Sequence, residues 1–461
     1  MNKLKKTIKP GQILVLGFLV MIFLGGFLLW LPISSADGTF TPFLDCLFTS
    51  TSASCVTGLT TINTAEHWSI FGKIVILALI QVGGLGFITL FITVLMVTGR
   101  RITLNERRVF QQTFNLTKHS GIVRFVRFLM TFTVVAELGG ALLLALRFMV
   151  DYPPLKAIGF GIFHAISAFC NAGFDIVGTV SLSDYAQDFA INIVIIALVI
   201  TGGVGFPVWI EFAELIRNRN RNKTSLKYKL SKLSLHTKLV LTSTVVLLVL
   251  GTVATLCFEF NNPKTIGTFT AGGKVLASFF YSVVLRTAGF FTISSGGLNS
   301  STKFISVILM MIGGSPCGTA GGIKTIPIAV VAITAASLLK EKDSVHSFKR
   351  SISLNVIQKS LAVIALMLSI LVLSTTVLSI TEANMPFEYE FLDLLYEVSS
   401  ALGTVGSSVG LTPYLSIAGK INIMICMFIG RLGPITIAIS FLTDDPDKNK
   451  IHYPQENVLV G

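Results

Sequence analysis

The sequence predicts an all-α polytopic membrane protein built from four repeated units, each a helix, a pore half-helix and a second helix. Two observations carry this prediction. The first is composition: of 461 residues, 52% are apolar and only 13% are charged, whereas a soluble domain has roughly 25% charged residues. The second is repetition. A short motif ending in glycine occurs four times, at Gly58, Gly173, Gly289 and Gly406, so that successive copies lie 115 to 117 residues apart.

Long apolar runs supply the expected membrane spans. Ile13–Ile33, Ala190–Ile210, Leu239–Phe258 and Leu361–Ile380 contain no charged residue. Each approaches or exceeds the roughly 20 residues that cross a bilayer as a helix. The first run is longer than the apolar core of a signal peptide, and we therefore expect a retained helix.

Charged residues alternate between basic and acidic segments. Basic clusters occupy 3–9, 100–127, 217–238 and 340–359, whereas the loops between them are mainly acidic. The positive-inside rule places basic segments in the cytoplasm. We expect a multi-pass protein of the plasma membrane with both termini cytoplasmic. The net charge of +13 does not indicate nucleic-acid binding, because membrane spans interrupt the basic surface.

Each unit is interpreted as an outward span, a run too short to cross, the glycine motif and a return span. The outward spans are expected near 13–33, 125–150, 236–258 and 353–381, the half-helices near 42–54, 156–170, 271–286 and 389–402, and the return spans near 70–98, 187–215, 302–339 and 416–442. This predicts eight transmembrane spans around one central ion pore. The expected repeats are 1–99, 100–216, 217–340 and 341–443, followed by a cytoplasmic tail, 444–461.

Glycine at the end of a half-helix has a physical use in a pore. Irregular backbone at membrane depth is tolerated only where it is buried in protein or lines a water-filled cavity. Glycine accepts positive φ without a Cβ penalty, so successive carbonyl groups can face one axis and replace the hydration shell of a cation. The carbonyl ends of four half-helices add negative dipole ends. The pattern therefore favours passage of a monovalent cation.

The third return span carries a stretch that cannot hold a regular helix firmly. Residues 313–322 contain five glycines and Pro316, and glycine costs about 1 kcal/mol and proline about 3 kcal/mol in a helix interior. We expect this span to break into two helices joined by an intramembrane gating loop. Its residues are Gly313, Gly314, Ser315, Pro316, Cys317, Gly318, Thr319, Ala320, Gly321 and Gly322, with Lys324 beside them. Arg431, inside the fourth return span, is expected to obstruct cations with this loop.

Similar glycine clusters occur in the first and second return spans, at 83–86 and 202–205, where we expect close helix packing. Two further charged residues lie on half-helices. We expect Arg286 either to cap helix carbonyls or to have a functional role in the membrane, and Glu397 is a candidate partner for it. The six cysteines form no C-x-x-C pair, so neither a zinc site nor a disulfide framework is indicated.

Six segments together resemble the Trk/Ktr/HKT superfamily of potassium-translocating membrane subunits. They are V-T-G-L (56–59), N-A-G-F (171–174), R-T-A-G-F (286–290), G-T-V-G (403–406), G-G-S-P-C-G-T-A-G-G-I-K-T (313–325) and G-R-L-G-P (430–434). The resemblance covers nearly the whole chain and is strongest to the bacterial Ktr type. It implies potassium uptake through a selectivity filter of main-chain carbonyls, formed by Val56, Thr57, Gly58, Asn171, Ala172, Gly173, Thr287, Ala288, Gly289, Thr404, Val405 and Gly406.

The same resemblance implies further properties. Glycine at position 58, where serine in the family accompanies sodium permeation, points to K⁺ as the transported ion. Uptake in the family is commonly sodium-dependent, which makes Na⁺ a candidate activator. Expected partners are membrane lipid, a second copy in a homodimer, and a cytoplasmic nucleotide-binding regulatory ring of the KtrA type. No organic cofactor and no metal beyond monovalent cations are expected on this chain.

Two other function classes stay open at this point. A Trk-type or sodium- or proton-coupled cation secondary transporter is the alternative, although such transporters usually consist of two inverted halves rather than four repeats of the same sense. An enzyme is disfavoured because the six histidines are scattered and no H-E-x-x-H, G-x-S-x-G or P-loop motif occurs.

Overall fold

The structure is a computed structural model that describes residues 10–98, 100, 122–178, 181–219, 232–341, 344–383, 388–434 and 436–437. Regular structure in these ranges is helical apart from a two-stranded hairpin, β1 (His346–Ser347) with β2 (Arg350–Ser351). Most of the basic segments 100–127 and 217–238 and the whole tail 444–461 lie outside the described residues. The all-α fold class is confirmed.

Four long helices open the four units. They are α1 (Pro10–Trp30), α7 (Ile122–Phe148), α12 (Leu235–Glu259) and α16 (Leu354–Thr381). With 21 to 28 residues each and a rise of about 1.5 Å per residue, each is long enough to cross a bilayer. Apolar side chains remain exposed on their outer faces, for example Leu16, Leu138 and Val372. Such faces suit contact with lipid tails.

Four shorter helices follow at the predicted half-helix positions. They are α2 (Phe43–Ser54), α8 (Pro154–Phe169), α13 (Ala271–Val284) and α17 (Phe391–Gly403). Their carboxyl-terminal halves are buried and rich in small or hydroxyl residues; in α2, every residue from 48 to 54 is buried. Small side chains there allow four helix ends to approach one another closely.

The first two return segments are bent, which the packing interpretation of their glycines did not anticipate. Helix α4 (Ile70–Leu85) meets α5 (Phe87–Val97) at 94°, and α9 (Phe189–Gly203) meets α10 (Phe206–Arg219) at 97°. Gly86 (φ +79°) and Gly205 (φ +93°) stand at the breaks. A positive φ ends a right-handed helix and is accessible to glycine at little cost. The first two return segments are therefore broken as well as the third, for which the break was expected.

The third and fourth return segments also end at irregular backbone. Helix α14 (Ser300–Met311) is separated from α15 (Thr325–Leu338) by the predicted loop, which confirms the broken third span. Helix α18 (Ile417–Leu432) ends at Gly433, which has φ +83°. Short elements complete the described chain: η1 (Pro32–Ser34), α3 (Thr64–His67), η2 (Ser183–Tyr185), η3 (Ser295–Gly297) and η4 (Thr412–Tyr414).

The number of spans depends on how the bent segments are counted. Among the described residues, four helices are long and apolar enough to cross alone, and the two bent pairs raise the number to six. The α14–loop–α15 segment and α18 would complete eight spans. The eight-span count stays a prediction.

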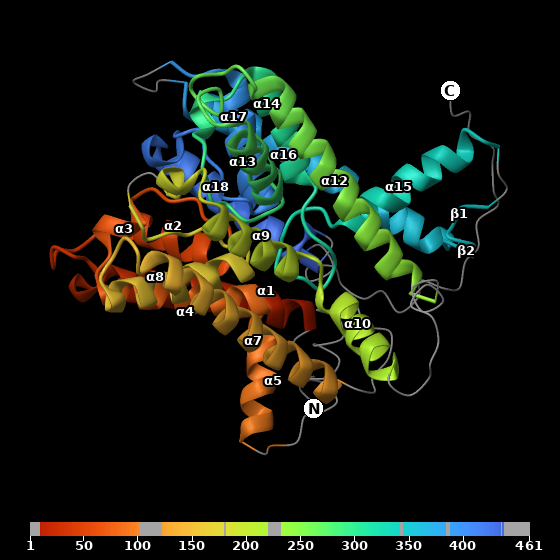
Figure 1. Cartoon of the computed structure of the whole chain (residues 1–461), viewed down its shortest axis with the longest axis horizontal. Coiled ribbons are helices and arrows are strands. Elements are labelled where there is room, and N and C mark those ends of the chain that lie inside the picture. Colours follow the sequence, from red (N-terminus) through yellow and green to blue (C-terminus); the bar gives the residue numbers. More distant parts are fainter. Residues whose placement is uncertain are drawn as a thin grey trace, which may run out of the picture.

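Each return helix packs against the half-helix of the following unit. Helix α4 contacts α8, α9 contacts α13, α14 contacts α17, and α18 contacts α2. The last pairing joins the fourth unit to the first, so the units close into a ring. In Figure 1, α5, α10 and α15 lie at the lower and right edges of the view, away from this packed centre.

Cysteine burial varies around the ring. None of the six cysteines, all within the described residues, forms a disulfide; Cys46, Cys55, Cys170 and Cys426 are buried, whereas Cys257 is exposed on α12. Within the described ranges, no three His, Cys, Asp or Glu residues gather in a way that could hold a metal ion.

Candidate ion-conducting site

The strand after each half-helix has the same backbone pattern in all four copies. Its first residue and its glycine both have positive φ: Val56 +58° and Gly58 +98°, Asn171 +59° and Gly173 +69°, Thr287 +77° and Gly289 +70°, Thr404 +52° and Gly406 +90°. The middle residue does not. Positive φ is unfavourable for β-branched valine and threonine, and strain of this kind clusters at functional sites. Because residues with positive φ alternate with a residue that lacks it, successive carbonyl groups can point to one side, as an ion filter requires.

The four glycines meet in one ring, in chain order. A Cβ atom at Gly58 would lie 2.5 Å from the Ala172 carbonyl oxygen, one at Gly173 2.6 Å from that of Ala288, one at Gly289 2.6 Å from that of Val405, and one at Gly406 2.0 Å from that of Thr57. Real Cβ atoms do not approach so closely. The carbonyl of each middle residue therefore occupies the space beside the glycine of the preceding copy, and any side chain there would displace it.

Backbone amides of the strands are bonded back to the half-helices. The middle-residue amide donates to a serine carbonyl at 2.8 Å in three copies: Thr57 to Ser52, Ala172 to Ser167, and Val405 to Ser400. In the third copy, Ala288 donates to Val284 at 3.0 Å instead. These amides are committed to the helix ends and do not occupy the strand carbonyls, although in the third copy the Ala288 carbonyl accepts from the Phe290 amide at 3.0 Å. The third strand departs from strict four-fold symmetry.

Side chains of the second and third strands link to each other behind the backbone. Asn171 and Thr287 are joined by a side-chain hydrogen bond of 3.2 Å. With its amide oriented to accept this bond, Asn171 also donates to the carbonyls of Ala168 and Val199, at 3.1 and 3.2 Å. Both side chains are buried. Asn171 and Thr287 therefore hold these two strands together with their side chains.

The predicted gating loop is closed at its base by backbone pairing. Gly313 donates to the Ile323 carbonyl at 2.8 Å, and Ile323 donates to that of Met311 at 3.1 Å. Within the loop, Ser315 donates to the Gly203 carbonyl at 2.9 Å and Thr319 to that of Gly202 at 3.2 Å. The loop is thereby held against the bend of the second return segment.

The loop also contacts the strands that carry the four glycines. A Cβ atom at Gly321 would lie 2.1 Å from Thr404 Oγ1, and one at Gly313 would lie 3.3 Å from Thr287 Cγ2. Both threonines are the first residues of their glycine-carrying strands, next to the half-helix ends. Thr319 Oγ1 donates to the last carbonyl of α8, that of Phe169, at 3.1 Å. The loop therefore lies against the half-helix ends of the glycine-carrying strands.

Arg431 joins this loop to the first return segment. Its Nη1 donates to the Thr319 carbonyl, and its Nη2 donates to the carbonyls of Gly83 and Gly84, the latter at 2.8 Å. Lys324 Nζ donates to the Ala320 carbonyl. The structure thus brings together Arg431, Lys324 and the loop, as the sequence predicted, and adds the first return segment to the group.

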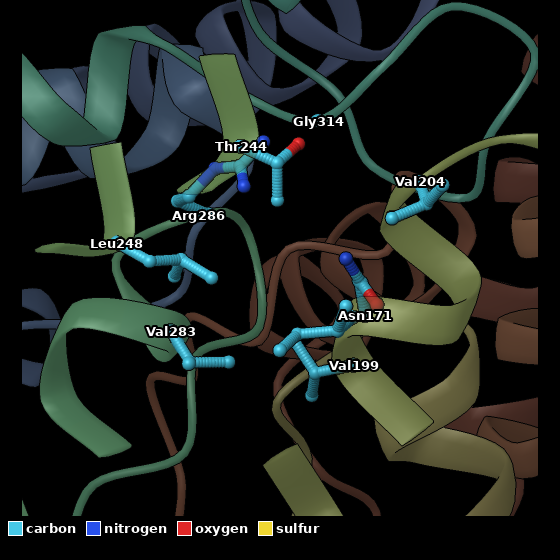
Figure 2. A pocket seen from close by; sticks show the side chains of 10 residues that line it. Asn171, Val199, Val204, Thr244, Leu248, Val283, Arg286 and Gly314 are labelled. Carbon is cyan, nitrogen blue, oxygen red and sulfur yellow. The ribbon is translucent and has the colours of Figure 1, made fainter. Parts of the chain in front are cut away.

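Arg286 lies beside Gly313, at the start of the loop. Its side chain is 9% exposed, Nη2 lies 3.4 Å from the Gly313 carbonyl, and Nε has no partner among the described residues. Figure 2 shows Arg286 and Asn171 on different sides of a small cavity, which has room for about one water molecule. Glu397 is not its partner, because that carboxylate accepts from Ser408, Val409 and Thr412.

Glycines of the return helices permit close approach to the half-helix ends. A Cβ atom at Gly83 would lie 2.0 Å from the Ser54 carbonyl oxygen, one at Gly202 2.0 Å from that of Phe169, and one at Gly430 2.1 Å from that of Leu402. The expected packing role therefore holds for Gly83 and Gly202. Sequence reasoning did not separate these from Gly86 and Gly205, which form the bends. It also missed Tyr396 and Ser407, described below.

Comparison with known proteins places the chain among cation transporters. The family described as "TrkH: Cation transport protein" matches residues 5–453. "Potassium/sodium uptake protein NtpJ" of Enterococcus hirae is 37% identical, over 100% of this chain and 99% of that protein. "Ktr system potassium uptake protein B" of Bacillus subtilis is 38% identical, over 98% and 97%. The solved potassium transporter TrkH of Vibrio parahaemolyticus has the same fold, with a TM-score of 0.72 at 19% identity, covering 96% of this chain and 86% of that one. The chain belongs to the TrkH family of cation transport proteins.

Proposed function

We propose that this chain is the pore subunit of a Ktr-type system for potassium uptake across the plasma membrane. The observation that carries the proposal is the ring of four strands whose glycines each face the carbonyl of the next copy. Two relatives that are at least 37% identical along their whole length are named uptake proteins for potassium, or for potassium and sodium. The twelve strand residues 56–58, 171–173, 287–289 and 404–406 are the proposed filter.

Selection at this filter follows from main-chain chemistry. A cation that enters the ring exchanges water oxygens for strand carbonyls, aided by the negative ends of four half-helix dipoles. The strands are held from behind, by amides bonded to the helix ends and by the Asn171–Thr287 bond. Because the third strand is bonded differently, the filter offers fewer equivalent ion sites than a strictly four-fold channel.

The loop 313–322 and Arg431 are the proposed gate. In the conformation described, the loop lies across the half-helix end of the filter, and Arg431 holds it to the first return segment. The fixed positive charge also opposes a cation. A regulatory partner can open this path only if it favours the displaced loop over the closed one.

Partners, orientation and sodium dependence belong to the same proposal. Membership of a Ktr-type system fits a homodimer seated on a cytoplasmic nucleotide-binding ring of the KtrA type, with Na⁺ as an activator. The charge pattern supports cytoplasmic termini. Helices α5, α10 and α15 lie at the edge of Figure 1 and continue toward the basic segments, where such a ring would dock.

Transport of sodium as well as potassium is the second candidate, because the Enterococcus hirae relative is named for both ions. Glycine rather than serine at position 58 supports potassium preference. Uptake of rubidium-86 into a host that lacks its own potassium uptake distinguishes the two. We expect potassium to compete with rubidium far better than sodium does. Equal competition by sodium would establish the second candidate, and no uptake with the regulatory ring present would refute both.

A further inference from the structure

We propose that a buried chain of hydroxyl groups centred on Tyr396 fixes the strand after the fourth filter glycine and so contributes to discrimination between potassium and sodium. The proposal rests on the ion-translocating function proposed above. It concerns Ser407, the residue directly after Gly406, and two tyrosines on neighbouring half-helices.

The chain of hydroxyl groups links the third and fourth units. Tyr396 Oη on α17 lies 2.7 Å from Ser407 Oγ and 3.1 Å from Tyr281 Oη on α13. Ser407 Oγ also lies 2.9 Å from Ser295 Oγ, and Tyr281 Oη lies 3.0 Å from Ser306 Oγ. All five side chains are buried, none more than 4% exposed. Buried hydroxyl groups of this kind are costly unless each is bonded.

The direction of these hydrogen bonds follows from Ser306, at one end of the series of hydroxyl groups. Ser306 Oγ donates its single hydrogen to the Thr302 carbonyl at 2.7 Å, so Tyr281 must donate to Ser306. Tyr396 therefore donates to Tyr281, and Ser407 donates to Tyr396. Ser295 then donates to Ser407. Every hydroxyl group donates once, and each except Ser295 accepts from the next, which makes Tyr396 the acceptor that fixes the Ser407 side chain.

This polar arrangement occurs in the fourth unit and not at the same register in the other three. Ten residues before the glycine, where the fourth unit has Tyr396, the other units have Phe48, Phe163 and Phe279. One residue after the glycine, where the fourth unit has Ser407, they have Leu59, Phe174 and Phe290, all buried. The fourth unit thus has hydroxyl-bearing side chains at both of these positions, where the other units have apolar ones.

A second anchor lies directly beside the first. Glu397, fully buried on α17, accepts from the Val409 amide at 3.1 Å, from Thr412 Oγ1 at 2.8 Å and from Ser408 Oγ. The fourth strand is therefore held at Ser407, Ser408 and Val409 by directional bonds. At this register the side chains of Leu59, Phe174 and Phe290 are held by apolar packing, which is non-directional; in the second unit the Phe174 carbonyl also accepts from Ser167 Oγ at 2.8 Å.

Directional anchoring bears on selectivity because of ion size. The smaller sodium ion requires the filter to contract, and a filter favours potassium when its carbonyls resist that contraction. The resistance can come from the size of the ion site or from the number of carbonyls that coordinate the ion. Releasing Ser407 removes one of the two anchors of the fourth strand and lets this strand move further toward the axis. A hydrogen bond of ordinary net strength corresponds to about a two- to tenfold change in an equilibrium, and the expected loss of discrimination is of that size.

The test measures the ratio of rubidium to sodium uptake by full-length protein in proteoliposomes. Tyr396→Phe keeps the ring and removes the hydroxyl group; Ser407→Ala removes its partner; and the double variant completes the cycle. Tyr389→Phe is the matched control, because its hydroxyl group donates to the Glu382 carbonyl at 2.8 Å, away from the filter. We expect each single variant to lower the ratio about two- to tenfold, the double variant to be no worse than the larger single, and the control to match the wild type.

A merely structural role would reduce the amount of protein recovered without moving the ratio. An unchanged ratio in recovered Tyr396→Phe and Ser407→Ala protein, or fully additive effects in the double variant, would overturn the proposal. Where Tyr396→Phe is not recovered, Tyr281→Phe removes the next hydroxyl group in the chain and must lower the ratio in the same direction. A wild-type protein that takes up neither ion would instead refute the transport function.

Discussion

Replacing Arg431 by glutamine tests whether this side chain latches the loop shut. Arg431 donates to three carbonyls, and one of them, that of Thr319, belongs to the loop. The bond to Thr319 is the one that must break when the loop moves away from the first return segment. The variant removes this bond in the closed conformation and leaves the filter residues unchanged.

The size of the effect follows from that single bond. A hydrogen bond to a charged group contributes about 1.5–3 kcal/mol net, which corresponds to roughly a 10- to 150-fold change in the ratio of open to closed protein. Basal flux should rise by up to this factor, limited by the fraction of protein that is already open. Dependence on the regulatory partner should weaken correspondingly.

The assay is rubidium-86 uptake into proteoliposomes without the regulatory partner. Arg147→Gln is the matched control, because Arg147 pairs with Asp151 and Asp188 and contacts no part of the loop. Arg431→Lys separates two mechanisms. Lysine keeps the charge but lacks the planar fork that reaches two elements, so a latch predicts raised flux and a pure charge barrier predicts the wild-type value. Low, partner-dependent flux in correctly inserted Arg431→Gln protein would refute the latch.

Three further outcomes are expected. Gly58→Ser should erode discrimination against sodium in uptake competition, because its Cβ would lie 2.5 Å from the Ala172 carbonyl oxygen; Gly38→Ser, with φ +66° and open space around it, is the control and should behave as wild type. Deleting Ser315–Ala320 should raise basal rubidium flux, since Gly313 and Ile323 still pair at the base of the loop; unaltered flux in folded protein would place the gate elsewhere. In a cysteine-free background, a cysteine at Ser344 should label only from the cytoplasm and one at Asn299 only from outside. Cysteines at positions 120 and 222, which lie beyond the described residues, should label from the cytoplasm as well. Labelling of position 222 from outside would overturn the four-unit topology.

The half-helices and the loop could be predicted from the sequence because both depend on local backbone conformation. The four half-helices are apolar runs too short to cross, each followed by a glycine, the residue that adopts positive φ at the least cost, so their spacing is visible without a structure. The loop was predictable for a similar reason, because Pro316 and five glycines within ten residues disfavour a helix wherever the segment lies.

Features that depend on neighbouring units were decided only by the tertiary structure. The cluster at 83–86 is compatible with a straight, tightly packed helix or with a bend, and one glycine costs too little, about 1 kcal/mol, to choose between them. The structure uses Gly83 for packing and Gly86 for the bend. Arg431 reaches Gly83 across 348 positions of the chain, and Tyr281 reaches Tyr396 across 115. Such pairs are fixed by which return helix lies beside which half-helix when the ring closes, and no local propensity encodes that.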